Sequence, residues 1–143
     1  MSSIFSFTAS VHIGRPVDDV FAHVADPRGF PGWNSAVESV HASGRRYVMQ
    51  RRLPGGRVTN ELEVVERRPP TAFTVRTTTG PTPFVYRYRF QPADGGTLLT
   101  LLGEVELSGL AALAGPAARH AVKRGVDANL ATLRSILEHA PTR

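Results

Sequence analysis

The chain has 143 residues, of which 41% are hydrophobic, and this length is typical of one domain with a single core. It contains no cysteine, which excludes disulfide bonds and thiolate metal sites. Its formal net charge of +5 is concentrated in residues 45–89, where ten basic and three acidic side chains give +7. We therefore expect one domain over residues 1–143, with a basic surface on its middle segments.

No segment of the sequence is typical of an export signal or a membrane span. The N-terminal residues lack the basic start and the apolar core of a secretory signal. No run approaches the ~20 apolar residues that a membrane-spanning helix needs. We therefore expect a cytoplasmic protein without a membrane span.

The N-terminal third predicts a strand followed by two short helical segments. Apolar and polar residues alternate over residues 5–13, which is the period of a half-buried strand. Pro16 then suits the first turn of a helix, and Pro27 ends that helix. A second short turn is expected before Trp33. The apolar stripe of the first helix consists of Val17, Val20, Phe21 and Val24.

The middle of the chain predicts strands joined by tight connections. Apolar residues alternate with polar ones between residues 37 and 107, and turn sequences rich in Pro and Gly interrupt them. These turns lie at residues 54–56, 69–70, 80–83 and 94–96. Together with the first strand, the pattern predicts an antiparallel sheet of about seven strands.

The last predicted element is a long amphipathic helix over residues 116–139. At about 1.5 Å per residue it is roughly 36 Å long, and it can bury its apolar stripe only against a curved sheet. Leu113 does not share that stripe, so we expect a bend at Gly115 and Pro116. Residues 108–119 then form either a flexible gate to the cavity, which we predict, or a rigid kink that closes the core. The stripe consists of Val122, Val126, Leu130, Leu133 and Leu137.

Two stretches of the sequence form a recognisable pattern. One consists of Ile13, Pro16, Val20, Phe21, Val24, Asp26, Phe30 and Trp33, and the other of residues 129–133, Asn-Leu-Ala-Thr-Leu. The first resembles the N-terminal signature, and the second the closing helix, of the START-like superfamily, also called SRPBCC, and in particular of its polyketide cyclase/dehydrase-like branch. The resemblance implies an α+β helix-grip fold, in which a curved antiparallel sheet encloses a cavity against the C-terminal helix. It indicates fold better than function, because the branch contains ligand binders, cyclases and hydroxylase domains.

The inward-facing positions of the predicted strands favour a small-molecule site. An apolar and aromatic hollow with a few polar groups is the usual composition of such sites. Arg51 and Asn60 each interrupt an apolar face, and a buried polar group needs a partner, such as a ligand carbonyl or carboxylate. Alternatively, Arg51 reaches outward at an edge and Asn60 bonds a neighbouring backbone group. The expected ligand-binding residues are Trp33, Tyr47, Met49, Arg51, Asn60, Phe73, Tyr86, Tyr88 and Leu113.

Other searches of the sequence yield no catalytic or metal motif. The five histidines lack ligand-like spacing, so we expect no metal, and no cofactor motif is present. His23 and Asp26 lie one helical turn apart, but a surface histidine beside a helix-ending aspartate is the simpler interpretation. No residue is therefore assigned a catalytic role.

Three functions remain open from the sequence. The first is binding of a hydrophobic small molecule of lipid, polyketide or aromatic type. The second is a polyketide cyclase or dehydratase, in which Arg51 holds a carbonyl oxygen and a tyrosine moves protons. The third is an interaction module that uses an outer sheet face carrying Arg76, Arg87 and Arg89. Nucleic acid is the less favoured partner because no nucleic-acid motif accompanies the charge, and a homodimer stays open.

Overall fold

The computed structural model describes residues 2–53 and 55–140 and contains one antiparallel sheet of seven strands, in the order β1-β7-β6-β5-β4-β3-β2. The strands are β1 (Ser2–Ile13), β2 (Val37–Ser43), β3 (Arg46–Leu53), β4 (Gly56–Arg68), β5 (Ala72–Thr79), β6 (Phe84–Ala93) and β7 (Gly96–Ser108). The helices are α1 (Val17–Val24), the 3-10 helix η1 (Pro27–Gly32), α2 (Leu110–Ala114) and α3 (Pro116–Glu138).

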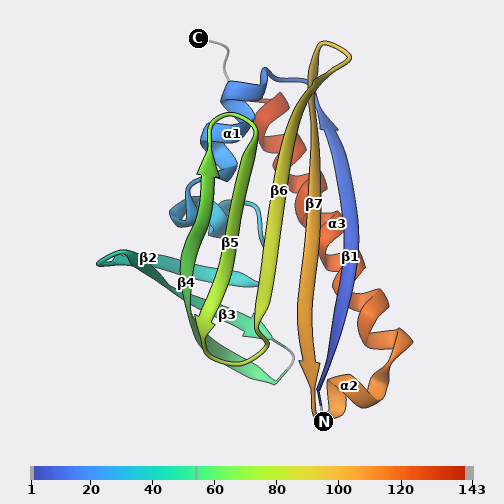
Figure 1. Cartoon of the computed structure of the whole chain (residues 1–143). Helices are drawn as coiled ribbons and strands as arrows, with labels where there is room; N and C mark the ends of the chain where they lie inside the picture. Colours follow the sequence, from blue (N-terminus) through green and yellow to red (C-terminus); the bar gives the residue numbers. More distant parts are fainter. Residues whose placement is uncertain (1, 54, 141–143) are drawn as a thin grey trace.

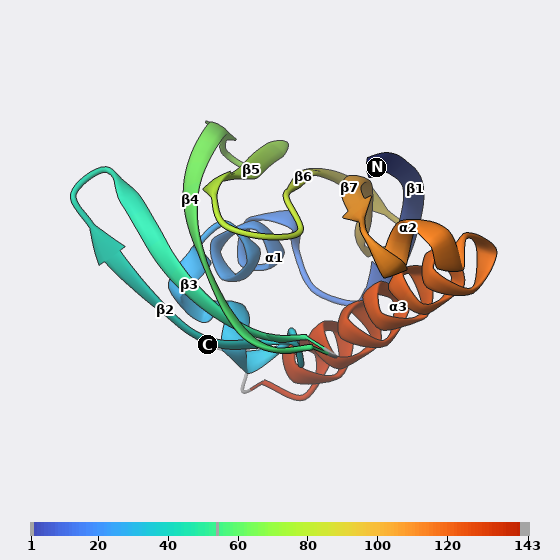
Figure 2. The same cartoon turned by 90° about the horizontal axis from the view of Figure 1, so that it is seen from below.

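The sheet curves around the long C-terminal helix. In Figure 1, α3 runs behind β7 and β1 along the length of the sheet. Seen from below in Figure 2, the strands arch from β1 to β2, and α3 lies along the open side of the arch. The α3 side chains that are buried in the core are Val126, Leu130, Leu133 and Leu137. The α+β helix-grip predicted from the sequence is therefore confirmed.

The predicted break before the long helix is also confirmed, because α2 and α3 are separate helices. Gly115 joins them with φ of +56°, a left-handed conformation that a residue with a side chain rarely adopts. Gly109, before α2, has φ of +60°. The backbone therefore turns at both ends of α2. No helix within residues 2–53 and 55–140 is long and apolar enough to cross a membrane.

Polar contacts fix the C-terminal end of α3 to the turn between β1 and α1. Arg15 Nη1 donates hydrogen bonds to the carbonyl oxygens of Leu137 at 3.0 Å and Ala140 at 3.3 Å. In the opposite direction, the Gly14 N–H donates to Glu138 Oε2 at 2.7 Å. A cation at a helix C-terminus also interacts favourably with the helix dipole. This end of α3 is thus held by reciprocal hydrogen bonds.

We predict that Glu138 makes the stability of the protein depend on acid pH. The Gly14 N–H bond, and then Arg134, lower the pKa of the Glu138 carboxyl. A lowered folded-state pKa means that the stabilisation is present above the unfolded pKa and is lost as pH falls through the folded pKa. Glu138→Gln keeps an oxygen acceptor but does not titrate. Urea unfolding between about pH 7 and pH 3 should therefore give a shallower decline for this variant than for the wild type. An unchanged slope would contradict the assignment.

The gate over residues 108–119 remains a prediction, for which the structure supplies a reason. Leu113 and Ala114 are exposed on α2, whereas Leu130 and Leu133 of α3 are buried. Local opening is most frequent where few apolar contacts are buried. Hydrogen exchange measured by mass spectrometry should be faster at residues 112–118 than at residues 126–137. Equal protection of the two segments would reject the gate.

Candidate functional site

A cavity of about 320 Å³ lies between the sheet and α3. The segment around η1 contributes Phe30, Trp33, Asn34, Ala36 and Val37, and β3 contributes Met49, Arg51, Arg52 and Leu53. Thr82, Phe84, Tyr86, Tyr88 and Val105 come from the β5–β6 turn, β6 and β7. The helix α3 contributes Ala121, Val122, Gly125, Val126 and Asn129.

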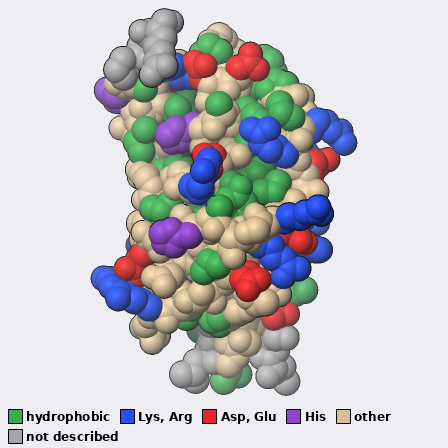
Figure 3. Space-filling view, turned by 90° about the vertical axis from the view of Figure 1, so that its left-hand side faces the viewer, with side chains coloured by type: hydrophobic (Ala, Val, Ile, Leu, Met, Phe, Trp, Pro, Cys, Tyr) green, Lys and Arg blue, Asp and Glu red, His purple; other side chains and the backbone are tan. Residues whose placement is uncertain are grey.

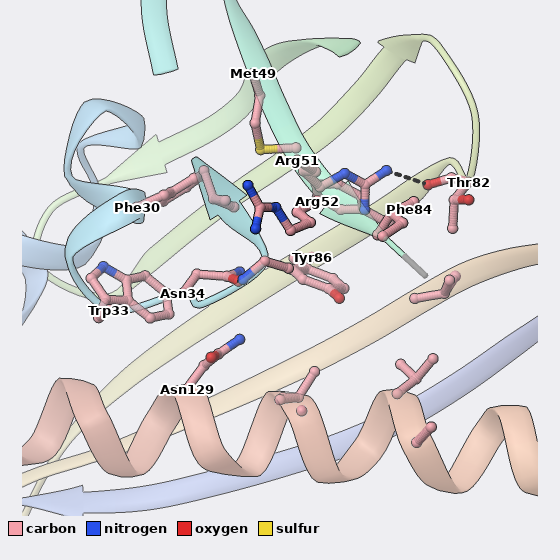
Figure 4. A pocket seen from close by; sticks show the side chains of 18 of the residues that line it. Phe30, Trp33, Asn34, Met49, Arg51, Arg52, Thr82, Phe84, Tyr86 and Asn129 are labelled. Atoms are coloured by element: carbon pink, nitrogen blue, oxygen red, sulfur yellow. Dashed lines mark hydrogen bonds between the residues drawn. The ribbon is translucent and has the colours of Figure 1, made fainter. Parts of the chain in front are cut away.

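Aromatic rings form one wall of this cavity (Figure 4). Phe84, Tyr86 and Tyr88 are alternate residues of β6, so their side chains leave the same face of the strand. The ring centroids are 4.5 Å apart for Phe84 and Tyr86 and 6.4 Å apart for Tyr86 and Tyr88. Trp33 meets Tyr88 edge-on at 6.4 Å. The rings therefore make a continuous apolar surface from β6 to the end of η1.

A single arginine is buried beside this aromatic wall. Arg51 is 9% exposed, and its guanidinium carbon lies 5.3 Å from the centre of the Phe84 ring. Its Nε and Nη2 donate to Asn60 Oδ1 at 3.1 and 2.8 Å. Its Nη2 also donates to the carbonyl oxygens of Pro81 at 3.0 Å and Thr82 at 3.1 Å, the second of which is drawn in Figure 4. All of these acceptors are electrically neutral.

Asn60 links Arg51 to the turn between β5 and β6. Its side chain is fully buried, and its Nδ2 donates to the carbonyl oxygens of Thr79 at 3.0 Å and Pro81 at 2.9 Å. Gly80, within this turn, has φ of +96°, and a Cβ there would collide with the Thr59 carbonyl oxygen and with Asn60 Nδ2. Only glycine fits this position. The β5–β6 turn therefore packs against Asn60, and Asn60 accepts hydrogen bonds from Arg51.

Burial sets the protonation of the two tyrosines in the cavity. It raises the pKa of Tyr86 to about 12, although the nearby Arg51 charge opposes the shift. Burial, and then Tyr86, also raise the pKa of Tyr88. Both phenols are therefore protonated at neutral pH and can donate hydrogen bonds. Burial lowers the pKa of Arg51, but an arginine guanidinium still stays charged. No Asp, Glu or His is among the described residues that line the cavity.

The structure brings five of the predicted ligand-binding residues together in the cavity wall, namely Trp33, Met49, Arg51, Tyr86 and Tyr88. Two other predicted residues lie behind this wall. Asn60 supports Arg51, so the alternative in which Asn60 bonds backbone groups is also correct. Phe73 is fully buried in the core, where its ring stacks on Tyr88 at 6.0 Å.

The remaining two predicted residues do not line the cavity. Tyr47 is half-buried near the β2–β3 hairpin, where it pairs with Ala42, away from the part of β3 that carries Arg51. Leu113 is 80% exposed on α2, because the turns at Gly109 and Gly115 direct this short helix away from the cavity. A periodicity argument identifies the inner face of an element but does not say where along it the cavity ends.

Sequence reasoning also missed several lining residues. Phe84 could have been found, since it shares the alternation of Tyr86 and Tyr88. Asn129 of α3 also lines the cavity, and its Oδ1 accepts a hydrogen bond from the Ser35 N–H at 3.1 Å. This hydrogen bond connects α3 to the loop after η1. It joins segments that are distant in the sequence, so no local sequence pattern predicts it.

His23 and Asp26 do not line the cavity either. Asp26 Oδ1 accepts a hydrogen bond from the Arg28 N–H at 3.1 Å and so caps η1. Its bonds to Arg28 lower the pKa of the Asp26 carboxyl, and burial lowers the pKa of His23. These contacts give Asp26 a structural role at the start of η1, and they do not involve the cavity.

The arginines of the outer sheet face point away from the core, as predicted. Arg76 pairs with Glu63, Arg87 with Glu104 at 2.7 Å, and Arg89 with Glu66 at 3.3 Å. On the face shown in Figure 3, basic and acidic side chains lie next to one another instead of in separate patches. Exposed pairs of this kind stabilise a protein by only about 0–1 kcal/mol each, but they offset the local positive charge.

Comparison with protein families identifies the class of this chain. It belongs to the family described as polyketide cyclase / dehydrase and lipid transport, whose sequence profile matches residues 5–138. Comparison with curated protein sequences gave no significant match.

Solved structures with the same fold come from several bacteria. TTHA0849 of Thermus thermophilus is 19% identical, with a TM-score of 0.82 over 96% of this chain and 100% of that one. A START superfamily protein from Mycobacterium smegmatis is 14% identical, with a TM-score of 0.78 over 93% and 97% of the two chains. The di-domain ARO/CYC BexL from the BE-7585A biosynthetic pathway is 25% identical, with a TM-score of 0.69. The similarity covers 96% of this chain but 51% of BexL, so this chain spans about half of that protein.

We predict that Asn60→Ala destabilises the fold through Arg51. The variant removes the acceptor of two guanidinium hydrogen bonds and leaves the Thr79 and Pro81 carbonyls without their amide donor. Leaving buried polar groups unpaired costs about 1–3 kcal/mol. Thr59→Ala, at the exposed neighbouring position, is the matched control and should change the unfolding free energy by about 0.5 kcal/mol or less. Urea unfolding measures both, and equal effects would refute the network.

Proposed function

We propose that this chain binds a hydrophobic small molecule of lipid, polyketide or aromatic type in the cavity between the sheet and α3. The observation that carries the proposal is a cavity of about 320 Å³ whose wall is mainly apolar and aromatic, with a few polar groups that include Arg51, Tyr86, Tyr88, Asn34 and Asn129. Such a composition is typical of small-molecule sites. Family membership and the similarity to a START superfamily protein support the same proposal.

A second candidate is a polyketide cyclase or dehydratase that acts in the same cavity. It is supported by the similarity to a di-domain ARO/CYC protein and by Arg51 and Tyr86, which can both donate hydrogen bonds to a carbonyl oxygen on which charge develops. However, a cyclisation or dehydration also needs a proton acceptor. The described lining residues include no carboxylate or imidazole, and burial keeps the tyrosines protonated. We therefore favour binding over catalysis.

The helix α3 contributes part of the opening of the cavity. Ala121 and Gly125 line the cavity and are exposed to solvent, as is Arg52 on the opposite side. A Cβ at Gly125 would meet no atom within 4 Å. Glycine inside a helix is less favourable than alanine by about 1 kcal/mol, and no packing contact requires it here. The small residues leave room at the entrance.

We predict that a large side chain at position 125 blocks ligand entry. The probe is N-phenyl-1-naphthylamine, a neutral aromatic compound whose fluorescence rises in apolar surroundings. Gly125→Trp should weaken its binding at least about tenfold, since the ring would occupy the entrance. Gly125→Ala is the matched control, which should bind normally and be more stable by about 0.5–1 kcal/mol because of helix propensity. If the wild type binds neither this neutral probe nor an anionic probe with the same rings, the proposed function is overturned.

A further inference from the structure

The charge of the cavity distinguishes its wall from the rest of the molecule. Among the described residues, eight other arginines, all on the surface, each lie within 4.0 Å of a glutamate, namely Arg46, Arg52, Arg57, Arg68, Arg76, Arg87, Arg89 and Arg134. Arg51, the buried one, forms no ion pair with any acidic side chain among residues 2–53 and 55–140, and its hydrogen bonds go to neutral oxygens. Its positive charge is therefore uncompensated within the described part of the chain.

A buried charge without a counter-charge is costly, and neutral carbonyl groups replace only part of the hydration that it loses. Arg51 nevertheless occupies this position in the cavity wall, where a methionine or leucine could pack without burying a charge. A negatively charged group in the cavity would remove the imbalance. At low local dielectric, such an ion pair is much stronger than the hydrogen bond of a neutral carbonyl.

The donors that could hold such a group are still free. A guanidinium has five N–H bonds, and Arg51 uses those of Nε and Nη2. Its Nη1 has no hydrogen-bond partner among the described residues and is not fully enclosed. The Tyr86 hydroxyl likewise has no partner there. Both side chains lie against the Phe84 ring, whose centre is 5.3 Å from the Arg51 guanidinium carbon and 4.5 Å from the centre of the Tyr86 ring (Figure 4).

Much of the rest of the cavity wall is apolar, although Asn34 and Asn129 also line it. It contains Phe30, Trp33, Val37, Met49 and Val126, all of which are buried. A ligand that fills the cavity must therefore combine an apolar body with one polar group near Arg51. At the entrance, Arg52 places a second positive charge, which shares Glu38 with Arg57. A positive entrance raises the local concentration of anions.

We propose that the ligand of this cavity is an amphipathic organic acid, whose anionic oxygens are held by Arg51 Nη1 and the Tyr86 hydroxyl. This inference rests on the proposed function and adds the chemical class of the ligand to it. The acidic group lies against Arg51, and the hydrocarbon or aromatic body lies against Trp33, Phe30 and Met49. A neutral molecule of the same shape binds more weakly, because it leaves the Arg51 charge uncompensated.

A matched pair of fluorescent probes tests this selectivity. 1-Anilinonaphthalene-8-sulfonate carries the same rings as N-phenyl-1-naphthylamine, together with one anionic group. The wild-type protein should bind the anionic probe at least about tenfold more tightly than the neutral one. Arg51→Met should abolish that preference by weakening the anionic probe at least about tenfold while leaving the neutral probe unchanged or stronger. Tyr86→Phe should weaken the anionic probe by a smaller factor.

Two controls separate the cavity from the surface. Arg76→Met removes a charge from the outer sheet face and should leave both affinities unchanged. Competition on the wild-type protein needs no variant and therefore answers the question even if Arg51→Met does not fold. In this competition experiment, the concentration of dodecanoate that displaces the neutral probe should be at least about tenfold lower than the concentration of dodecanol that does so.

The outcomes distinguish this inference from the proposed function. If neither probe binds, the proposed function fails and the inference fails with it. If both probes bind but wild type and Arg51→Met show the same preference for the anionic probe over the neutral one, the anionic ligand class is wrong. The same conclusion follows if dodecanol competes as well as dodecanoate. In both cases, binding of a hydrophobic molecule in the cavity still stands. If Arg76→Met weakens the anionic probe as much as Arg51→Met does, the sulfonate binds at the surface and the assignment to Arg51 is overturned.

Discussion

The hydrogen bonds that hold Arg51 inside the sheet are the constraint on which the site depends. A guanidinium can be buried only if most of its donors are paired, and here the acceptors come from Asn60 and from the backbone of the β5–β6 turn. The β5–β6 turn requires a glycine at position 80, because a side chain there would displace Asn60. Two segments, β4 and the β5–β6 turn, thus fix one side chain of β3. The guanidinium carbon lies 5.3 Å from the centre of the Phe84 ring, and no described residue accepts a hydrogen bond from Nη1.

The long helix divides into a part that stabilises the fold and a part that borders the cavity. Leu130, Leu133 and Leu137 are buried in the core, and the contacts of Arg15 and Glu138 fix the end of the helix to the start of α1. The preceding turns carry Val122 and Gly125, which both line the cavity, and a Cβ at Gly125 would meet no atom within 4 Å. Close packing at one end therefore allows the other end to border empty space without loss of the fold.

The sequence predicts the fold and most of the cavity wall because strand periodicity is a strong local signal. Met49, Arg51, Tyr86 and Tyr88 were placed on the inner face by alternation alone, and all four line the cavity. Tyr47 and Leu113 were misplaced because alternation does not show where the curved sheet leaves the cavity or how a five-residue helix is oriented. The bond between Arg51 and Asn60 depends on register, which sets Arg51 opposite Val58 and Asn60 opposite Met49. That register follows from the shape of the β3–β4 turn, which the sequence only outlines.

The distribution of the arginines shows why total charge was a weak guide to function. The excess of residues 45–89 suggested a basic outer face, but arginines there are paired with glutamates on the same or neighbouring strands, as in Arg87 with Glu104. Such pairs lie in water, where the interaction of two charges is small. Arg51 is one charge among many in the sequence, yet it is the one that lies in the cavity wall at low dielectric. A charge in that position interacts more strongly with a neighbouring charge than the paired arginines of the outer face do, because water screens it less.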